Sequence, residues 1–353
     1  MNTGYGQAVA TKVARRTQAE RTEATTSALV DAARALFARE GYDATSLDAQ
    51  LARDDTLAVF GFGPDAPSSD DPRYLRVPLH PHGVAPLEVW RTRGPVRAGR
   101  QGALHFAESE GLQFGWIEIP EGDAGLEAAS ARAYANLSVF VRTRAFPHLL
   151  RSWNYLDAIT QGEGDAERYR RFCVGRASGL GGIEIGTLPA ATAIGRCDGV
   201  RTLQVYWLAA RRPGTPVENP RQVSAYRYPR QYGPQSPSFA RAMLPPSNAM
   251  PLLLSGTASV VGHESLHHDC IESQLSETFA NFESLIGAAR TLRPELPARF
   301  GAHSRLKVYV RDADALPRIA QALETHLDPA IPRVLLHAAV CRRELRVEID
   351  GVL

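Results

Sequence analysis

The chain has 353 residues, of which 44% are apolar, and its 40 Lys and Arg against 38 Asp and Glu leave a net charge of +2. This near balance argues against nucleic acid as a ligand, and no run of eighteen apolar residues indicates a membrane span. The cysteines at 173, 197, 270 and 341 lack the paired short spacing of a zinc site, so we expect free thiols, no metal and a cytoplasmic protein.

The N-terminal part has a different pattern from the rest. Residues 11 to 50 begin with a basic cluster, and the apolar side chains of residues 29–37 recur at helical spacing until Gly41. This segment resembles the first helix of TetR-type repressors, but the helix that would enter the major groove is missing after Asp48. We therefore interpret residues 1–54 as an extension without function, and a role in transcription depends on this segment alone.

The body begins at residue 55, and its apolar periodicity predicts alternating strands and helices. In the first half, strands are expected near 57–63, 87–92, 103–106, 112–119, 149–155 and 202–209, with helices at 126–142 and 165–173. In the second half, strands are expected near 239–244, 252–261, 306–311 and 345–350, with helices at 271–286 and 316–327. The repeated order predicts an α+β fold of two halves, 55–237 and 238–353, each a mixed sheet with helices on one face and a cleft between them.

The last strand carries the main candidate for chemistry. Val347 and Ile349 alternate with Glu348, which predicts a half-buried strand whose polar side faces water or a cleft. If the preceding helix crosses over between parallel strands, Glu348 shares a face with Tyr309 and Arg311. Glu348 is then either a surface carboxylate or an acid beside a site for an anionic substrate.

Several motifs in the body resemble those of the chorismatase family, which is built on the RidA/YjgF fold. They are Trp153-Asn154-Tyr155, Phe172-Cys173-Val174-Gly175-Arg176, Glu218-Asn219-Pro220, the segment 228–234, Phe239-Ala240-Arg241-Ala242 and the strand Val347-Glu348-Ile349-Asp350. The resemblance implies an enzyme without a cofactor that removes pyruvate from chorismate, and we expect a monomer. One branch of the family hydrolyses chorismate to a dihydroxycyclohexadiene carboxylate, and the other forms 3-hydroxybenzoate. Gly256 and Cys341 are similar to the second branch.

The resemblance and the chemistry together assign roles to eight residues. Glu348 is the expected general acid, Cys341 shapes the pocket or assists ring opening, and Gly256 lets the substrate approach its strand. The side chains expected to bind the substrate carboxylates and hydroxyl are Arg241, Arg311, Tyr155, Tyr228 and Tyr232. Two alternatives stay open, namely a hydrolytic chorismatase and a RidA-like imine deaminase.

Overall fold

The computed structural model describes Met1 and residues 46–353, apart from residues 85–86 and 183. The TetR-like helix predicted before Gly41 lies outside the described residues. Residues Leu47–Leu353 form one compact unit. Among the described residues, none of the helices is both long and apolar enough to cross a bilayer.

The first described helix, α2 (Leu47–Leu51), packs on the body. Leu47 is buried in one cluster with Val59 and Tyr74 of a small sheet. That sheet has the order β2-β1-β4, formed by β1 (Thr56–Phe62), β2 (Tyr74–Val77) and β4 (Glu88–Arg91). The packed body therefore starts at α2, a few residues before the boundary expected at 55.

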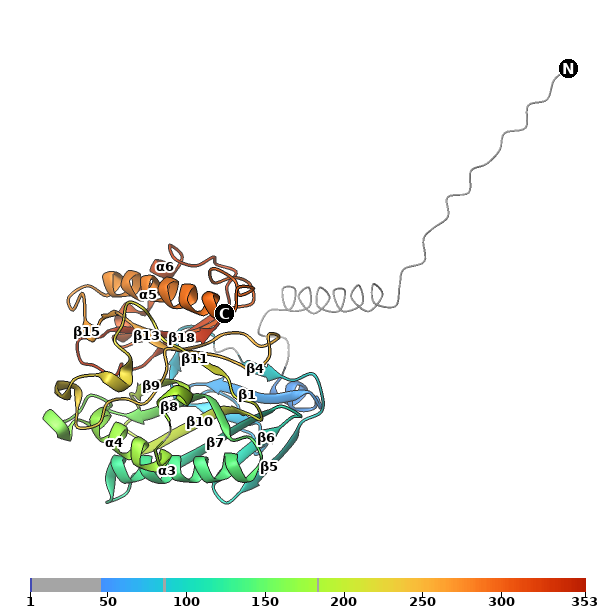
Figure 1. The fold of residues 1–353 in the computed structure, drawn as a ribbon, viewed down its shortest axis with the longest axis horizontal. Helices are drawn as coiled ribbons and strands as arrows, with labels where there is room; N and C mark the ends of the chain where they lie inside the picture. The colour runs from blue at the N-terminus through green and yellow to red at the C-terminus, as the bar shows by residue number, and fades with distance from the viewer. Residues whose placement is uncertain (2–45, 85–86, 183) are drawn as a thin grey trace. The chain divides into compact units, whose positions relative to one another are not determined.

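Two larger sheets form the body (Figure 1). The first sheet consists, in spatial order, of β5 (Arg97–Gln101), β6 (Leu104–Glu108), β7 (Leu112–Pro120), β10 (Thr202–Ala210), β8 (His148–Asp157) and β9 (Ala190–Arg196). The second consists of β11 (Thr215–Val217), β12 (Ala242–Leu244), β13 (Leu253–Ala258), β18 (Val347–Val352), β16 (Arg305–Val310), β17 (Arg333–His337) and β3 (His80–Pro81). A hairpin adds β14 (Val260–Val261) and β15 (Glu264–Ser265).

Four longer helices accompany the two sheets. They are α3 (Gly125–Thr143), α4 (Arg168–Leu180), α5 (Ile271–Leu292) and α6 (Leu316–Leu323). Short 3-10 turns lie at η1 (Gly164–Ala166), η2 (Ile185–Thr187), η3 (Ala225–Arg227), η4 (Arg230–Tyr232) and η5 (Ala313–Ala315). Apolar residues of α3 and α4 pack on one face of the first sheet, and those of α5 and α6 pack on one face of the second.

The two halves repeat one topology. The order β6-β7-β10-β8-β9 with α3 and α4 matches the order β12-β13-β18-β16-β17 with α5 and α6. In each half the strand after the second helix pairs in parallel with the strand before it, as β8 does with β9 and β16 with β17. Each half of the structure therefore contains one strand more than the repeat that the sequence pattern predicts.

This extra strand corrects the predicted crossover. Helix α6 connects β16 to its parallel neighbour β17, whereas β16 and β18 are antiparallel. The five residues 333–337 show no apolar alternation of their own, so the sequence pattern does not distinguish this strand from the stretch that follows. The alternation along β18 is nevertheless present, because Val347 and Ile349 join the helix-covered core while Glu348 points to the opposite side.

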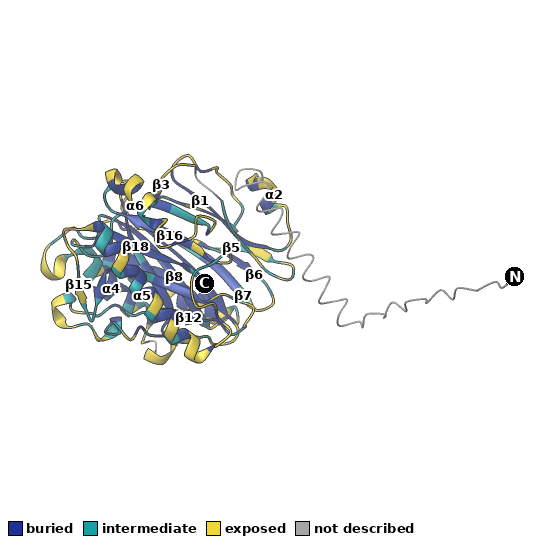
Figure 2. Cartoon of the chain, turned by 90° about the horizontal axis from the view of Figure 1, so that it is seen from above, coloured by how far each residue is buried: buried dark blue, intermediate teal, exposed yellow. Residues whose placement is uncertain are grey.

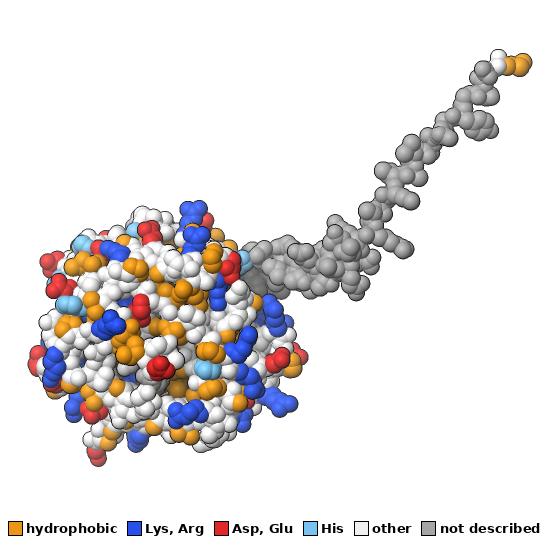
Figure 3. All heavy atoms as spheres, viewed as in Figure 1, with side chains coloured by type: hydrophobic (Ala, Val, Ile, Leu, Met, Phe, Trp, Pro, Cys, Tyr) orange, Lys and Arg blue, Asp and Glu red, His pale blue; other side chains and the backbone are white. Residues whose placement is uncertain are grey.

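The uncovered faces of the two sheets meet in the middle of the body (Figure 2). A central cluster combines Trp153 and Tyr206 of the first sheet with Leu253, Tyr309 and Leu336 of the second. Glu348 and Asp350 project into this inner layer, where their exposed fractions are 5% and 0%. On the face seen in Figure 3, acidic and basic side chains are interspersed, so this face has no continuous basic surface for nucleic acid.

Candidate active site

A cavity of about 430 Å³ opens between the two halves. Its walls come from α4, β9, β13, β18, the segment 222–241 and the turn 341–344. Six residues expected from the sequence line it: Glu348, Cys341, Gly256, Arg241, Tyr228 and Tyr232. Strands β18 and β13 hold Glu348 and Gly256, whereas the other four residues lie in the turns and loops that border the cavity.

The carboxyl group of Glu348 lies at the inner wall. Burial and the nearby negative charge of Asp350 raise the pKa of Glu348 to about 8, although Arg151, Arg241 and Arg342 oppose this shift. The sequence left open whether burial or the neighbouring guanidinium groups would prevail. Burial prevails, so Glu348 retains a proton near neutral pH and can act as a general acid.

Gly256 lies directly against this carboxyl group. A Cβ atom at residue 256 would lie 1.9 Å from Glu348 Oε1 and 2.9 Å from its Cδ. The missing side chain therefore makes room for the acid, and the expected approach of substrate to this strand stays a prediction.

Two arginines present unpaired donors at the cavity. Arg176 on α4 is 4% exposed, and its Nε and Nη2 have no hydrogen-bond partner among the described residues. Arg241 donates to the hydroxyl of Tyr228 at 2.7 Å, while its Nε lacks a partner in the same part of the chain. Buried unpaired donors are costly, so these guanidinium groups are suited to the oxygen atoms of a bound anion.

A third cation, Arg342, lies against two tyrosine rings. Its Cζ is 4.2 Å from the ring centre of Tyr232 and 5.2 Å from that of Tyr228. Its Nη1 also donates to the carbonyl oxygen of His263 at 2.9 Å. These contacts make a rigid cationic wall of the cavity.

Sequence reasoning did not single out Arg176 and Arg342, although both line the cavity. Arg176 belongs to the motif Phe172-Cys173-Val174-Gly175-Arg176 noted in the sequence, so the family resemblance could have indicated it. Arg342 follows Cys341 in an irregular turn, where periodicity says nothing about the direction of a side chain.

The thiols beside the cavity are neutral. Burial raises the pKa of Cys341 far above its usual range and raises that of Cys173 to about 12. Both residues line the cavity. Cys341 can therefore shape the cavity or donate a weak hydrogen bond, but it is not a thiolate near neutral pH.

Two of the expected substrate-binding residues lie away from the cavity. Tyr155 is fully buried between the sheets, where its hydroxyl lies 3.1 Å from that of Tyr206 and 3.2 Å from that of Tyr309. Arg311 pairs with Asp312 at 3.0 Å and donates to backbone carbonyl groups of the turn before β18. The structure therefore does not bring these two residues into the cavity, because Tyr155 points into the layer between the sheets and Arg311 lies past the end of β16.

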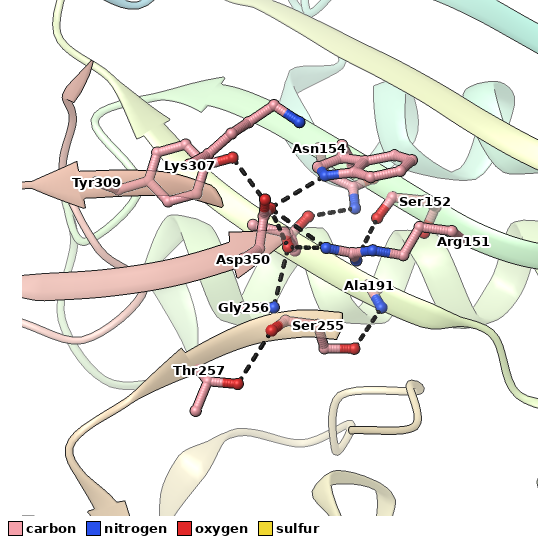
Figure 4. A network of polar contacts seen from close by, with 12 residues as sticks. Arg151, Ser152, Asn154, Ala191, Ser255, Gly256, Thr257, Lys307, Tyr309 and Asp350 are labelled. Atoms are coloured by element: carbon pink, nitrogen blue, oxygen red, sulfur yellow. Dashed lines mark hydrogen bonds and ion pairs between the residues drawn. The ribbon is translucent and has the colours of Figure 1, made fainter. Parts of the chain in front are cut away.

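A buried ion pair of Arg151 and Asp350, which the sequence did not indicate, joins the two halves (Figure 4). Asp350 Oδ2 accepts hydrogen bonds from Arg151 at 3.2 Å, Trp153 at 3.0 Å, Thr192 at 2.7 Å and Tyr309 at 3.0 Å. Arg151 and Asp350 both have fully buried side chains. The partners are separated by up to 199 residues in the chain, so no local pattern could have brought them together.

The histidines near the cavity make ordinary polar contacts. His263 Nδ1 lies 3.2 Å from the Tyr232 hydroxyl, and His267 Nε2 lies 3.1 Å from a carboxylate oxygen of Glu277. Among the described residues, no group of three or more His, Cys, Asp or Glu side chains could hold a metal ion.

The fold and cavity together define an α+β small-molecule enzyme, in which a carboxyl group with a raised pKa lines the same cavity as guanidinium groups with unpaired donors. The chain belongs to the chorismatase FkbO/Hyg5-like family, whose N-terminal model matches residues 88–209. A chorismatase of Streptomyces rapamycinicus is 35% identical over 275 residues, which cover 75% of this chain and 81% of the relative.

Two further comparisons agree with this family. A 3-hydroxybenzoate synthase of Streptomyces hygroscopicus is 34% identical over 277 residues, covering 75% of this chain and 81% of that protein. A crystal structure of a chorismatase superposes with a TM-score of 0.76 at 32% identity, covering 86% of this chain and 94% of the other. The structural match confirms the expected α+β fold, and the family confirms the resemblance seen in the body.

Proposed function

We propose that this protein converts chorismate to 3-hydroxybenzoate and pyruvate. The observation that carries the proposal is the protonated carboxyl group of Glu348 in a cavity that also contains the unpaired donors of Arg176 and Arg241. Chorismate has two carboxylates and an acid-labile enol ether, so it needs cations for binding and one proton for cleavage. The names of the relatives, which include both chorismatase and 3-hydroxybenzoate synthase, support the substrate.

In the proposed first step, Glu348 donates its proton to the terminal methylene carbon of the enolpyruvyl group. The resulting oxocarbenium-like group weakens the bond between its ether oxygen and ring carbon C3, and pyruvate leaves when this bond breaks. Arg176, Arg241 and Arg342 hold the substrate carboxylates during this step and restrict its orientation.

The second step forms the aromatic product. The 4-hydroxyl group of the ring attacks C3 as pyruvate leaves, and its proton returns to the Glu348 carboxylate. The resulting epoxide opens at its C4–O bond, and the oxygen that stays on C3 takes up one proton while C3 loses one, which gives 3-hydroxybenzoate with no net change in protons. Pyruvate and 3-hydroxybenzoate together contain all atoms of chorismate, so the route consumes no water. Gly256 and Cys341 support this branch because both are similar to the pattern of the aromatising enzymes.

The hydrolytic reaction is the second candidate, since relatives bear the general name chorismatase. There a water molecule attacks C3 and the product is a dihydroxycyclohexadiene carboxylate. Incubating the protein with chorismate in water enriched in oxygen-18 distinguishes the routes by mass spectrometry. We expect unlabelled 3-hydroxybenzoate, whereas one labelled hydroxyl on a non-aromatic diol would show hydrolysis. No pyruvate release would refute both and leave the imine deaminase to be tested.

A further inference from the structure

Strand β13 has an irregularity next to the acid. Its Leu254 pairs with Gly351 of β18, and its Thr257 pairs with Ile349, so three steps along β13 match two steps along β18. Such a bulge removes the residues inside it from the regular hydrogen-bond ladder. The backbone N–H of Gly256, which lies in the bulge, is instead donated to the side-chain hydroxyl of Thr192 at 3.0 Å.

The Thr192 hydroxyl comes from β9 in the other half of the body and has all its hydrogen-bonding capacity occupied. It donates to Asp350 Oδ2 at 2.7 Å and accepts from the Gly256 N–H and from Arg151 Nη2, the latter at 2.5 Å. A hydroxyl has one donor and two acceptor positions, and all three are used within the protein. Although Thr192 borders the cavity, it is 2% exposed and its hydroxyl has no position left for a substrate.

The position of the Gly256 backbone determines where the acid can lie. The Glu348 carboxyl group occupies the space that a Cβ atom of residue 256 would fill, at 1.9 Å from its ideal position. A shift of the bulge towards or away from Glu348 therefore moves the surface against which the carboxyl group rests. The only side chain that the described structure shows bonded to the Gly256 N–H is that of Thr192.

We propose that Thr192 is a positioning residue for the general acid: its hydroxyl fixes the Gly256 bulge to the buried Asp350–Arg151 pair, and the bulge in turn orients the Glu348 carboxyl group. This role rests on the proposed function, because it assigns a task to Thr192 in the same reaction. It also predicts that the hydroxyl matters for turnover and the methyl group does not.

Three substitutions separate these contributions. Thr192→Val keeps the shape and loses the hydroxyl, Thr192→Ser keeps the hydroxyl and loses the methyl, and Thr192→Cys keeps a weak hydrogen-bonding group. Thr278→Val is the matched control, since buried Thr278 on α5 also loses one hydroxyl bond, at 2.8 Å to the Gln274 carbonyl oxygen, away from the cavity. Kinetics of pyruvate release and the thermal unfolding midpoint are measured for all of them.

We expect Thr192→Val to lower kcat on the order of 10²-fold with KM changed less than about threefold, because a shift near 1 Å in a positioned group has an effect of this size. Thr192→Ser should stay within about threefold of the parent in kcat, and the control should show only a lower unfolding midpoint. If Thr192→Val does not fold, Thr192→Cys serves in its place, with an expected loss of about tenfold in kcat from the same shift.

Three results would overturn the positioning role. These are an undiminished kcat in Thr192→Val, or in Thr192→Cys if that variant is used; a rise in KM alone, which would mean direct contact with substrate; or equal losses in Thr192→Ser and Thr192→Val. A parent protein that releases no pyruvate from chorismate would instead refute the proposed function, so the two failures are distinguishable.

Discussion

The substitution Gly256→Ala tests the arrangement of the acid most directly. The added Cβ atom would lie 1.9 Å from Glu348 Oε1, whereas real Cβ atoms come no closer than about 3.0 Å to other heavy atoms. The carboxyl group must therefore retreat by about 1.1 Å or more, the difference between these distances. Its end is flexible and Gly256 has an ordinary backbone conformation, so the fold should persist with the acid displaced.

A displacement of this size in a positioned catalytic group costs on the order of 10²-fold in rate. Pyruvate release is measured in an assay coupled to lactate dehydrogenase. We expect its kcat to fall by about that factor while the unfolding midpoint changes by only a few degrees. We also expect the product to shift from 3-hydroxybenzoate towards the dihydroxycyclohexadiene carboxylate, because displacement of the acid admits water. The shift should be larger in the double variant with Cys341→Ala, in which the removed thiol leaves further space for water.

Gly287→Ala is the matched control, since Gly287 is an exposed position on α5 with no atom within 4 Å of the added Cβ. It should leave both rate and product unchanged and stabilise the helix slightly. If Gly256→Ala turned over at the parent rate and still gave 3-hydroxybenzoate alone, the close approach between Gly256 and Glu348 would have no catalytic meaning, and the assignment to the aromatising branch would lose its main support.

Five other predictions concern the acid, its cations and the N-terminal segment. Glu348→Gln should lower kcat by ~10²–10⁴-fold while isothermal titration still detects substrate binding, and near-parent turnover would exclude the acid role. The parent kcat/KM should be level at neutral pH and fall as pH rises through about 8, where Glu348 of the free enzyme loses its proton. Because the folded protein keeps this proton above the ordinary pKa of 4.5, stability should decrease as pH rises from about 4.5 to 8, and Glu348→Gln should lack that part of the slope in urea unfolding. Arg176→Lys keeps the positive charge but loses the planar guanidinium group that can bind a carboxylate with two hydrogen bonds, so KM should rise by about 10-fold or more. An unchanged KM would place the substrate carboxylates elsewhere. Removal of residues 2–45 should leave turnover unchanged, since residues 47–353 form a compact unit, and a folded but inactive product would contradict this.

Periodicity and motifs in the sequence predicted the helices and the face of the strand that holds Glu348. The alternation along β18 placed Glu348 opposite Val347 and Ile349, and the helices of both halves appeared near their observed positions. The parallel partner strands β9 and β17 were missed because short apolar runs have no distinguishing period. Their omission led to the wrong crossover, although β16 does lie beside β18 and Tyr309 pairs with Glu348. The Arg311 side chain lies elsewhere because it turns to Asp312 and to the turn before β18.

Side-chain direction and long-range pairing limited the prediction of the site. Tyr155 lies in a motif that matches the family, yet its hydroxyl points into the layer between the sheets rather than into the cavity. The contacts of Asp350 with Arg151 and Thr192 depend on how two sheets dock, which no single stretch of the chain encodes. The clash that a side chain at 256 would cause was equally invisible, because it arises between neighbouring strands.

The buried pair of Arg151 and Asp350 also constrains how the protein folds. Arg151 belongs to β8 of the first half and Asp350 to β18 of the second, and both are inaccessible to solvent in the complete body. If the inner face of one half lost its water before the other half packed on it, a charged side chain would be buried without its partner. Burying a single charge costs far more free energy than burying the pair. Water must therefore leave the two inner faces in the same event that joins them, so the halves should unfold in one cooperative transition. A chain cleaved in the segment 212–237 should yield fragments that become compact only when mixed.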